Sequence, residues 1–398
     1  MSENSKIAAR FSKVLTPNYR APAIAIVRGE GCTVYDAEGQ SYLDMMGGIA
    51  TVVLGHCHPR IVAALEKQSH LLWHTSNLFA STPQIELAER LVERSFADRV
   101  FFANSGAEAN EAALKLARLY HRAHGQDRYE IIAFEGGFHG RTLFTVSATG
   151  TPAYWKGFEP MVPGVHHAPY GDPEAVRALC SKRTAAIIIE PIQGESGVRP
   201  APAGFLAELR EIADENGCLL IVDEVQTGMG RTGTLFAHEP SGITPDIVTV
   251  AKALGNGIPI GAMLTREDVA KVFEPGTHGS TFGGNPLAAA CATAVVDELF
   301  PGGVLEESRQ VGFYLGEQLE AMQKRLGENK VVDVRGLGHL RAVELPGSAA
   351  PVIDRCREAG LLVIGAGDRN IRLAPPLVIR RQEVDTGLGI LEEAIRAD

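Results

Sequence analysis

The chain has 398 residues, of which 45% are hydrophobic and 22% are charged, and its formal net charge is -10. This composition is typical of a globular protein and excludes a disordered or fibrous chain. The length predicts about two to three domains. Nucleic-acid binding is disfavoured, because phosphate recognition needs a concentrated basic surface and the sequence contains no run of Lys or Arg.

The start of the chain, MSENSKIAARFSKVL, has no sustained apolar core, so we expect no secretory signal. The longest stretch of small apolar residues, 286–296, is shorter than the ~18 residues of a membrane span, and we expect no membrane partner. Six scattered cysteines without a C-x-x-C pair indicate a cytoplasmic protein. The His56-Cys57-His58 cluster lacks a second ligand pair, and Pro59 indicates a turn that opens a helix, so no metal site is expected.

In chain order, the first predicted element is a hairpin over 33–43, where alternating apolar residues flank an Asp-Ala-Glu-Gly turn. Helical patterns such as 108–121 and 204–216 then alternate with short apolar runs. These runs are typical of a largely parallel sheet that is covered on both faces, and they lie at 100–102, 131–134, 186–190, 219–223, 247–250 and 261–264. The alternation predicts a doubly wound α/β domain.

The pattern changes near 300–303. A long polar helix over 305–326 is followed by strand candidates at 331–334 and 340–345, then by a helix and another strand pair. We expect a smaller α+β domain here, joined by the N-terminal segment. The predicted division is an N-terminal segment 1–48 that packs with the small domain, a large domain 49–298 and a small domain 299–398.

Ligands of open α/β sheets bind beyond the carboxyl ends of the strands. The first such end leads into 104–110, where Ser105 and Glu108 fit the S-x-x-E capping box and Gly106 would let backbone N–H groups approach an anion. Taken alone, this pattern fits a well-capped helix at least as well.

The second strand end leads into the loop 135–141. Phe138 could stack on a flat ring, and Arg141 could grip a carboxylate with its planar fork. A surface loop with an exposed arginine is the alternative interpretation.

Two charged residues end later strands. Asp223 closes an apolar strand and needs a cationic partner there, either a protonated ring nitrogen or a structural Arg or Lys. Lys252 follows the run 247–250, where desolvation would lower its pKa and leave the neutral amine that Schiff-base chemistry requires. A surface lysine that extends into solvent is the alternative.

The segment 228–233 spells G-x-G-x-x-G, the fingerprint of a nicotinamide oxidoreductase. Pro240, Gly242 and Pro245 follow it, so the helix that a dinucleotide site needs is not expected, and this function class is disfavoured. The four strand ends instead combine an anion cup, a stacking aromatic ring, a carboxylate and an amine, which are the requirements of pyridoxal phosphate.

Long motifs carry a resemblance that covers nearly the whole chain: NSGAEANEAALKLAR, FHGRT, EPIQGE, DEVQTGMGRTG, AKALG and HGSTFGGNP. The sequence resembles the class III pyridoxal-phosphate aminotransferases of fold type I, most closely the acetylornithine aminotransferases. The resemblance implies a large domain with a mostly parallel seven-stranded sheet, and a smaller α+β domain built from both ends of the chain. It also implies a homodimer whose active sites are shared across the interface.

The resemblance implies two catalytic residues: Lys252, which forms the Schiff base, and Asp223, which pairs with the pyridine N–H. The other cofactor-binding residues that it implies are Ser105, Gly106, Ala107, Phe138, His139, Val225, Gln226 and the neighbouring subunit's equivalent of Thr281. The substrate-binding residues that it implies are Arg141 for the acyl-amino acid, Arg372 with its partner Glu195 for glutamate or 2-oxoglutarate, and Ser280.

The implied reaction is ping-pong transamination of N2-acetyl-L-ornithine with 2-oxoglutarate, in arginine biosynthesis. The donors left open are succinylornithine, N-succinyl-diaminopimelate, ornithine and 4-aminobutyrate, because an arginine recognises a carboxylate and not the acyl group. Three departures from the family pattern are Ala107 in place of Thr, Ser196 in place of Gly, and Asn256 within a glycine run.

Overall fold

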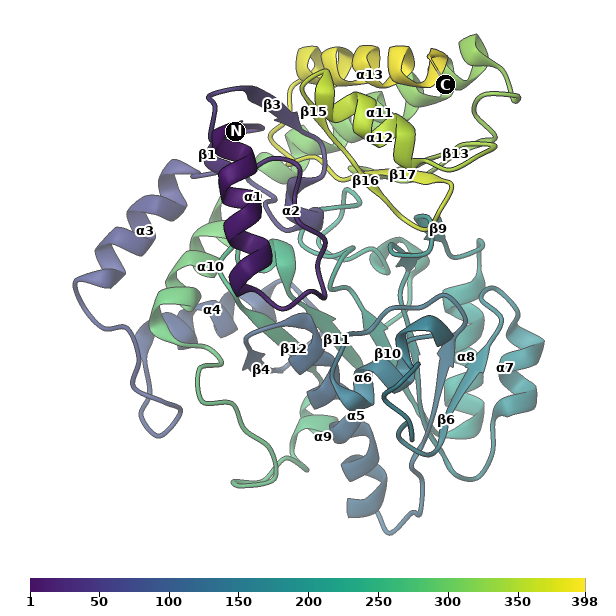
Figure 1. The fold of residues 1–398 in the computed structure, drawn as a ribbon. Helices are drawn as coiled ribbons and strands as arrows, with labels where there is room; N and C mark the ends of the chain where they lie inside the picture. Colours follow the sequence, from purple (N-terminus) through teal and green to yellow (C-terminus); the bar gives the residue numbers. More distant parts are fainter. Residues whose placement is uncertain (398) are drawn as a thin grey trace.

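The computed structural model describes residues 1–397 and is built around a seven-stranded sheet (Figure 1). In spatial order the strands are β4 (Arg99–Ala103), β12 (Gly261–Thr265), β11 (Ile247–Val250), β10 (Leu219–Asp223), β7 (Thr184–Ile189), β5 (Glu130–Phe134) and β6 (Val165–Ala168). Only β12 runs antiparallel to its neighbours. The six strands named from the sequence are confirmed. The pattern did not reveal β6, because its two histidines interrupt the apolar run.

Helices cover both faces of this sheet. One face carries α5 (Gly106–Ala123), α6 (Leu143–Ala148) and α9 (Glu267–Ala270), and the other carries α3 (Pro59–Ser69), α4 (Thr82–Glu93), α7 (Pro173–Leu179), α8 (Phe205–Asn216) and α10 (Pro286–Leu299). The side chains of β10 alternate between the two cores: Leu219 and Ile221 face one, and Leu220 and Val222 face the other. A strand that is buried on both sides must be apolar at every position, which explains the continuous hydrophobic runs.

A second structural unit contains the last hundred residues. Its sheet consists of β13 (Asp333–Leu337), β14 (Leu340–Glu344), β17 (Asn370–Leu373) and β16 (Ile364–Gly365), and its helices are α11 (Val304–Leu326), α12 (Ala350–Glu358) and α13 (Arg381–Arg396). Strand β13 begins two residues later than expected.

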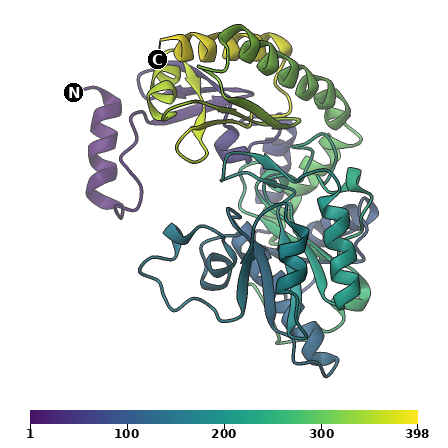
Figure 2. The same cartoon turned by 90° about the vertical axis from the view of Figure 1, so that its right-hand side faces the viewer.

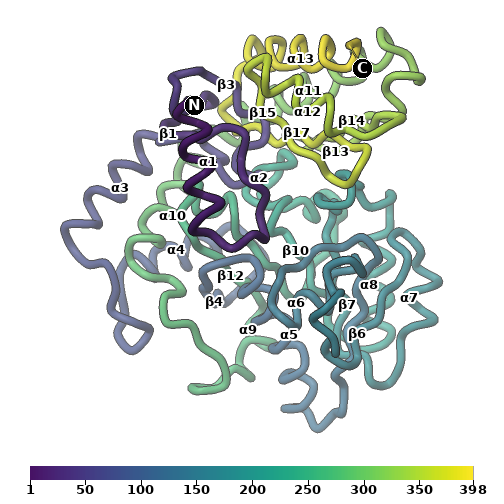
Figure 3. The backbone as a smooth tube through the Cα atoms, viewed as in Figure 1, coloured from purple at the N-terminus to yellow at the C-terminus, as the bar shows by residue number. Residues whose placement is uncertain are grey.

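Residues 26–45 of the N-terminal segment join this unit (Figure 3). The predicted hairpin forms as β2 (Thr33–Asp36) and β3 (Ser41–Asp44), next to β1 (Ile26–Glu30), and β3 pairs in parallel with β15 (Leu361–Leu362). Cys32 and Met45 share a buried core with residues of α11, α12 and α13. These contacts support the proposed division at 48 and 298, which stays a prediction about the folding units.

The N-terminal helix α1 (Glu3–Val14) stands apart from the rest of the chain (Figure 2). None of its residues is buried. Asn4 links it to the hairpin, because its side chain donates to Asp36 and its backbone N–H donates to Glu38, and its side chain also accepts from Ala25 N. Across residues 1–397 no single helix is long and apolar enough to cross a membrane; α10 and α11 pass that test only as a pair, and they meet at a 67° bend.

Six short elements complete the fold of residues 1–397. They are α2 (Gly47–Ala50), β8 (Ile192–Gln193), β9 (Arg199–Pro200) and the 3-10 turns η1 (Pro152–Tyr154), η2 (Glu239–Ser241) and η3 (Lys252–Leu254).

Candidate active site

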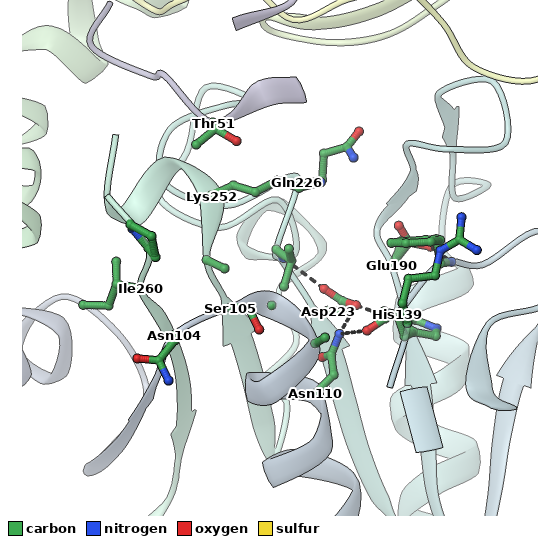
Figure 4. Close-up of a pocket in the computed structure, with 18 of the residues that line it drawn as sticks. Thr51, Asn104, Ser105, Asn110, His139, Glu190, Asp223, Gln226, Lys252 and Ile260 are labelled. Atoms are coloured by element: carbon green, nitrogen blue, oxygen red, sulfur yellow. Dashed lines mark hydrogen bonds and ion pairs between the residues drawn. The ribbon is translucent and has the colours of Figure 1, made fainter. Parts of the chain in front are cut away.

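A cavity of about 370 Å³ lies at the carboxyl ends of the central strands (Figure 4). Ten of the residues singled out from the sequence line it: Ser105, Gly106, Ala107, Phe138, His139, Arg141, Asp223, Val225, Gln226 and Lys252. Four do not line it: Glu195, Ser280, Thr281 and Arg372. The strand-end rule therefore located the cavity correctly, because parallel strands bring their carboxyl ends to one edge of the sheet.

Asp223 ends β10 as a buried carboxylate with three donors. Its Oδ2 accepts hydrogen bonds from His139 Nδ1 at 2.8 Å and from Asn110 Nδ2 at 2.7 Å, and its Oδ1 accepts one from Val225 N at 3.0 Å (Figure 4). No Arg or Lys of residues 1–397 pairs with it, so the structural cation considered from the sequence is not its partner. A carboxylate held in this way can face a cationic ring nitrogen.

Lys252 opens η3 two residues after the end of β11, with a positive φ of 41°. Burial lowers the pKa of its ammonium group, and the nearby Arg372 adds to this, while the carboxylates of Glu195 and Asp223 act in the opposite direction. The lowered pKa agrees with the sequence expectation, since a larger fraction of the amine is neutral and nucleophilic.

The N-terminus of α5 forms one wall of the cavity. Ser105 caps the helix by accepting a hydrogen bond from Glu108 N at 3.2 Å. The reciprocal half of the expected capping box is different, because the Glu108 carboxylate accepts from Asn104 N at 2.7 Å, one residue before the cap. The first N–H groups of a helix have no intrahelical partner, which makes this wall suited to a phosphate.

Gly106 is required by close packing at this wall. A Cβ added there would lie 2.6 Å from Val225 Cγ1, so any side chain would push the two walls of the cavity apart. Phe138 and Val225 line the same cavity and offer apolar surface to a flat ring.

Sequence reasoning missed Glu190, which also lines the cavity. It is 6% exposed and its Oε2 accepts the Phe138 N–H at 2.8 Å. Burial and the Asp223 carboxylate raise its pKa well above the usual range. The strand-end rule could have found this residue, since it ended the strand predicted over 186–190.

Arg372 and Glu195 form an ion pair beside the cavity. Arg372 Nη1 lies 2.6 Å from Glu195 Oε1 and also donates to the oxygens of Gly194 and Gln226, at 2.9 and 3.2 Å. Gln226 Nε2 donates to Glu195 Oε1 at 3.1 Å, so Gln226 bridges the pair and the cavity. Burial raises the pKa of Glu195, but Arg372 and Lys252 outweigh this effect and hold it below its usual value.

Ser280 and Thr281 lie on a loop outside this cavity. Ser280 Oγ accepts a hydrogen bond from Asn104 Nδ2 at 3.1 Å, which connects the loop to the cavity wall. Thr281 is exposed and lines two other hollows on the surface. The chain by itself therefore does not bring Thr281 to its own Lys252.

Two of the departures from the family pattern have structural partners. Asn256 accepts from Leu54 N at 2.7 Å and donates to Gly55 O at 3.0 Å, and Ser196 Oγ donates to Gly136 O.

Within residues 1–397 no group of three or more His, Cys, Asp or Glu side chains is arranged to hold a metal ion. Only the three-residue turn η2 follows the G-x-G-x-x-G segment before β11.

The cavity fits pyridoxal phosphate. It combines a helix N-terminus suited to a phosphate, the Asp223 carboxylate suited to a ring nitrogen, a lysine amine suited to an aldehyde, and Gly106, which lets the two walls approach closely. His139 Nε2 is buried and has no partner within residues 1–397, so the same wall also has a polar atom to offer.

Comparisons with known proteins agree with this chemistry. The family model described as aminotransferase class-III matches residues 14–395. The chain is 53% identical over 385 residues to the acetylornithine aminotransferase of Myxococcus xanthus, with 96% of each chain covered. It is 45% identical over 394 residues to the succinylornithine transaminase/acetylornithine aminotransferase of Pseudomonas aeruginosa, with 97% of this chain and 96% of that one covered.

The fold of the solved ornithine aminotransferase from Toxoplasma gondii ME49 is similar, with a TM-score of 0.95 and 33% identity over 100% of this chain and 96% of that one. The fold expected from the resemblance is confirmed. The chain belongs to the class-III aminotransferase family, and it is a pyridoxal-phosphate-dependent aminotransferase.

Proposed function

We propose that the protein transfers the terminal amino group of N2-acetyl-L-ornithine to 2-oxoglutarate, giving N-acetyl-L-glutamate 5-semialdehyde and L-glutamate. The relatives from M. xanthus and P. aeruginosa both carry acetylornithine aminotransferase in their names. The observation that carries the proposal is the pair of arginines at the cavity, since Arg141 lines it and Arg372 donates a hydrogen bond to Gln226, another lining residue. Two guanidinium groups suit substrates whose carboxylates lie at different distances from the reacting amine.

Pyridoxal phosphate, when bound, supplies an aldehyde for the amine and an electron-withdrawing ring. We assign its phosphate to the backbone N–H groups of Gly106 and Ala107 and to the Ser105 end of α5, and its ring face to Phe138 and Val225. Asp223 would hold the proton on the ring nitrogen, and His139 would orient Asp223 through the 2.8 Å hydrogen bond. Gln226 would lie near the ring hydroxyl.

Lys252 is the proposed acid and base. Because burial lowers the pKa of its ammonium group, Nζ can take a proton from the substrate carbon and later return one. Its strained φ of 41° supports a functional role, since a left-handed conformation is costly for a lysine and persists where the surroundings impose it.

Arg372 and Glu195 are proposed to distinguish the two substrates. While Glu195 neutralises Arg372, the site accepts a terminal amine that carries no neighbouring carboxylate. When Glu195 moves aside, Arg372 is free to hold the α-carboxylate of glutamate or 2-oxoglutarate. Arg141 would hold the α-carboxylate of the acyl-amino acid, with Ser280 at the border of the substrate site.

The test compares the catalytic efficiencies of the purified protein with N2-acetyl-L-ornithine, succinylornithine, N-succinyl-diaminopimelate, ornithine and 4-aminobutyrate. We expect acetylornithine to rank first. A different first donor would overturn the substrate assignment. Lys252→Ala should lose both turnover and the visible absorption band of protein-bound cofactor, whereas equally colourless wild-type and variant proteins after addition of cofactor would overturn the assignment of Lys252.

A homodimer with shared active sites is also proposed. The segment 71–79 exposes Leu71, Trp73, Leu78 and Phe79, and it contacts the Thr281 loop, since Asn77 donates to Ser280 O at 3.1 Å. Exposed apolar side chains gathered in this way are typical of an interface. Sedimentation should give a dimer, and Trp73→Glu should dissociate it; a monomeric wild type contradicts the proposal.

Thr281 provides a second test of sharing. If Thr281 serves the neighbouring site, a mixture of Lys252→Ala subunits and Thr281→Ala subunits should show a cofactor affinity that differs from that of either parent variant.

We propose a cytoplasmic location as well, on the support of six free cysteines at scattered positions. Fractionation of cells with an antibody against the chain tests this assignment.

A further inference from the structure

Arg141 is held by aromatic rings alone. Its Cζ lies 3.6 Å from the ring centroid of Tyr154 and 5.5 Å from that of Phe138, and these two rings meet edge to face at 5.9 Å. Within residues 1–397 the exposed Arg141 side chain has no hydrogen-bond or ion-pair partner. The stacking on Tyr154 is therefore the closest restraint on this guanidinium group.

The other arginine of the site is held in the opposite way. Arg372 donates to the Glu195 carboxylate and to two further oxygens. An arginine that is paired with a carboxylate must give up that partner before it binds a substrate carboxylate. An arginine stacked on a ring keeps all five N–H donors free at its edges.

Tyr154 is itself well anchored. It ends η1, its N–H donates to Thr151 O at 2.9 Å, and the next residue, Trp155, donates from Nε1 to the backbone oxygens of Val146 and Thr149, each at 2.9 Å. These bonds hold the backbone that carries Tyr154 against the C-terminal end of α6, so its ring can restrict the long and flexible side chain of Arg141 before substrate arrives. Such preorganisation lowers the entropic cost of binding.

We propose that Tyr154 is a specificity-determining positioning residue: its ring holds the Arg141 guanidinium with all donors free, ready for the carboxylate of the amino donor. This inference rests on the proposed function and extends it, because Tyr154 is not among the site residues that were assigned from the sequence. It predicts that the ring and not the hydroxyl group of Tyr154 sets the affinity for the donor.

The first test measures steady-state constants of the holoenzyme with N2-acetyl-L-ornithine. Tyr154→Leu should raise KM about three- to tenfold, the effect of losing one cation–π contact, and should change kcat less. Tyr154→Phe keeps the ring and should stay within about twofold of wild type. The matched control is Tyr35→Leu, which removes a ring at the same 3.6 Å from an arginine, Arg28, outside the cavity lining.

The second test separates positioning from structural damage. N2-acetyl-L-norvaline has the acyl group and the carboxylate but lacks the terminal amine, so its dissociation constant can be measured by calorimetry without reaction. Tyr154→Leu should weaken its binding as much as it raises KM. In an Arg141→Gln background the same change should add nothing.

Two results overturn the proposal: a Tyr154→Phe variant as impaired as Tyr154→Leu, or a Tyr154→Leu effect that persists without Arg141. Wild-type turnover of N2-acetyl-L-ornithine tests the proposed function, whereas the ratio of variant to wild type tests Tyr154. The two failures are therefore distinct.

Discussion

At the scale of single residues, the ion pair of Glu195 leads to a testable prediction about substrate discrimination. Its carboxylate lies 2.6 Å from Arg372 and accepts a second bond from Gln226. Glu195→Gln removes the charge that neutralises Arg372, so Arg372 should attract an α-carboxylate in both half-reactions. We expect the ratio of the glutamate to the acetylornithine half-reaction rate to rise about tenfold, the effect of one charge-assisted hydrogen bond.

The measurement is the rate of each half-reaction, followed separately by the absorbance of the bound cofactor. Glu328→Gln is the control, because it makes the same change of charge at an exposed position of the second unit. An unchanged ratio in Glu195→Gln would show that the ion pair does not distinguish the substrates.

The packing of α11 against the β13–β14 hairpin determines a pH dependence at the scale of elements. His339 lies in the hairpin turn, and its Nε2 donates to Ser308 O in α11 at 2.9 Å, while its buried Nδ1 has no partner within residues 1–397. Burial, with smaller contributions from the nearby Arg231 and Arg341, lowers the pKa of His339 from 6.5 to about 4. The folded chain therefore binds fewer protons here than the unfolded chain does at intermediate pH.

Acid therefore destabilises the folded chain through His339. The stabilising contribution of neutral His339 is complete above pH 6.5 and is lost as the pH falls from 6.5 towards 4, with a total of about 3 kcal/mol. His339→Gln keeps a donor for Ser308 and should make the urea midpoint less dependent on pH in this window. The exposed His70→Gln is the control and should keep the wild-type slope; equal slopes in all three proteins would contradict the prediction.

Arg231 connects three distant segments at the scale of the whole molecule. It is fully buried, it donates to the backbone oxygens of Pro375 and Ala50, and its own oxygen accepts the His339 N–H at 3.0 Å. Burial lowers its pKa to about 10, so the side chain stays charged at neutral pH. Arg231 thus links its own loop to the backbone at Ala50 and at Pro375, which lies three residues after Arg372.

Arg231→Ala should cost about 3–5 kcal/mol of stability, because it leaves a cavity and unpaired carbonyl groups in the core. Calorimetry should show a lower transition temperature. Arg99→Ala, which removes an exposed ion pair with Glu267, is the control and should cost less than about 1 kcal/mol. A melting temperature unchanged by Arg231→Ala would show that Arg231 does not stabilise the fold by connecting these segments.

The sequence by itself determined the large sheet and most of the cavity. Runs such as 219–223 are apolar at every position because both faces are covered, and polar residues such as Asp223 and Lys252 follow directly where the strands end. These are local patterns with a simple spatial consequence, since parallel strands end at one edge. Strand β6 escaped this reasoning because its histidines resemble a loop.

Only the tertiary structure decided how residues far apart in the chain meet. Glu195 and Arg372 are 177 positions apart, and Asn110 and Asp223 are 113 positions apart. No rule of sequence spacing could therefore give the geometry of the Glu195–Arg372 ion pair, or identify Asn110 as a hydrogen-bond donor to the Asp223 carboxylate. Tyr154 likewise gained meaning only from the guanidinium group that lies over its ring. The end of the predicted strand could have marked Glu190, but only the structure places the Asp223 carboxylate near it. The physical reason is that periodicity encodes which face of an element is buried, whereas electrostatic partners are set by how the elements pack together.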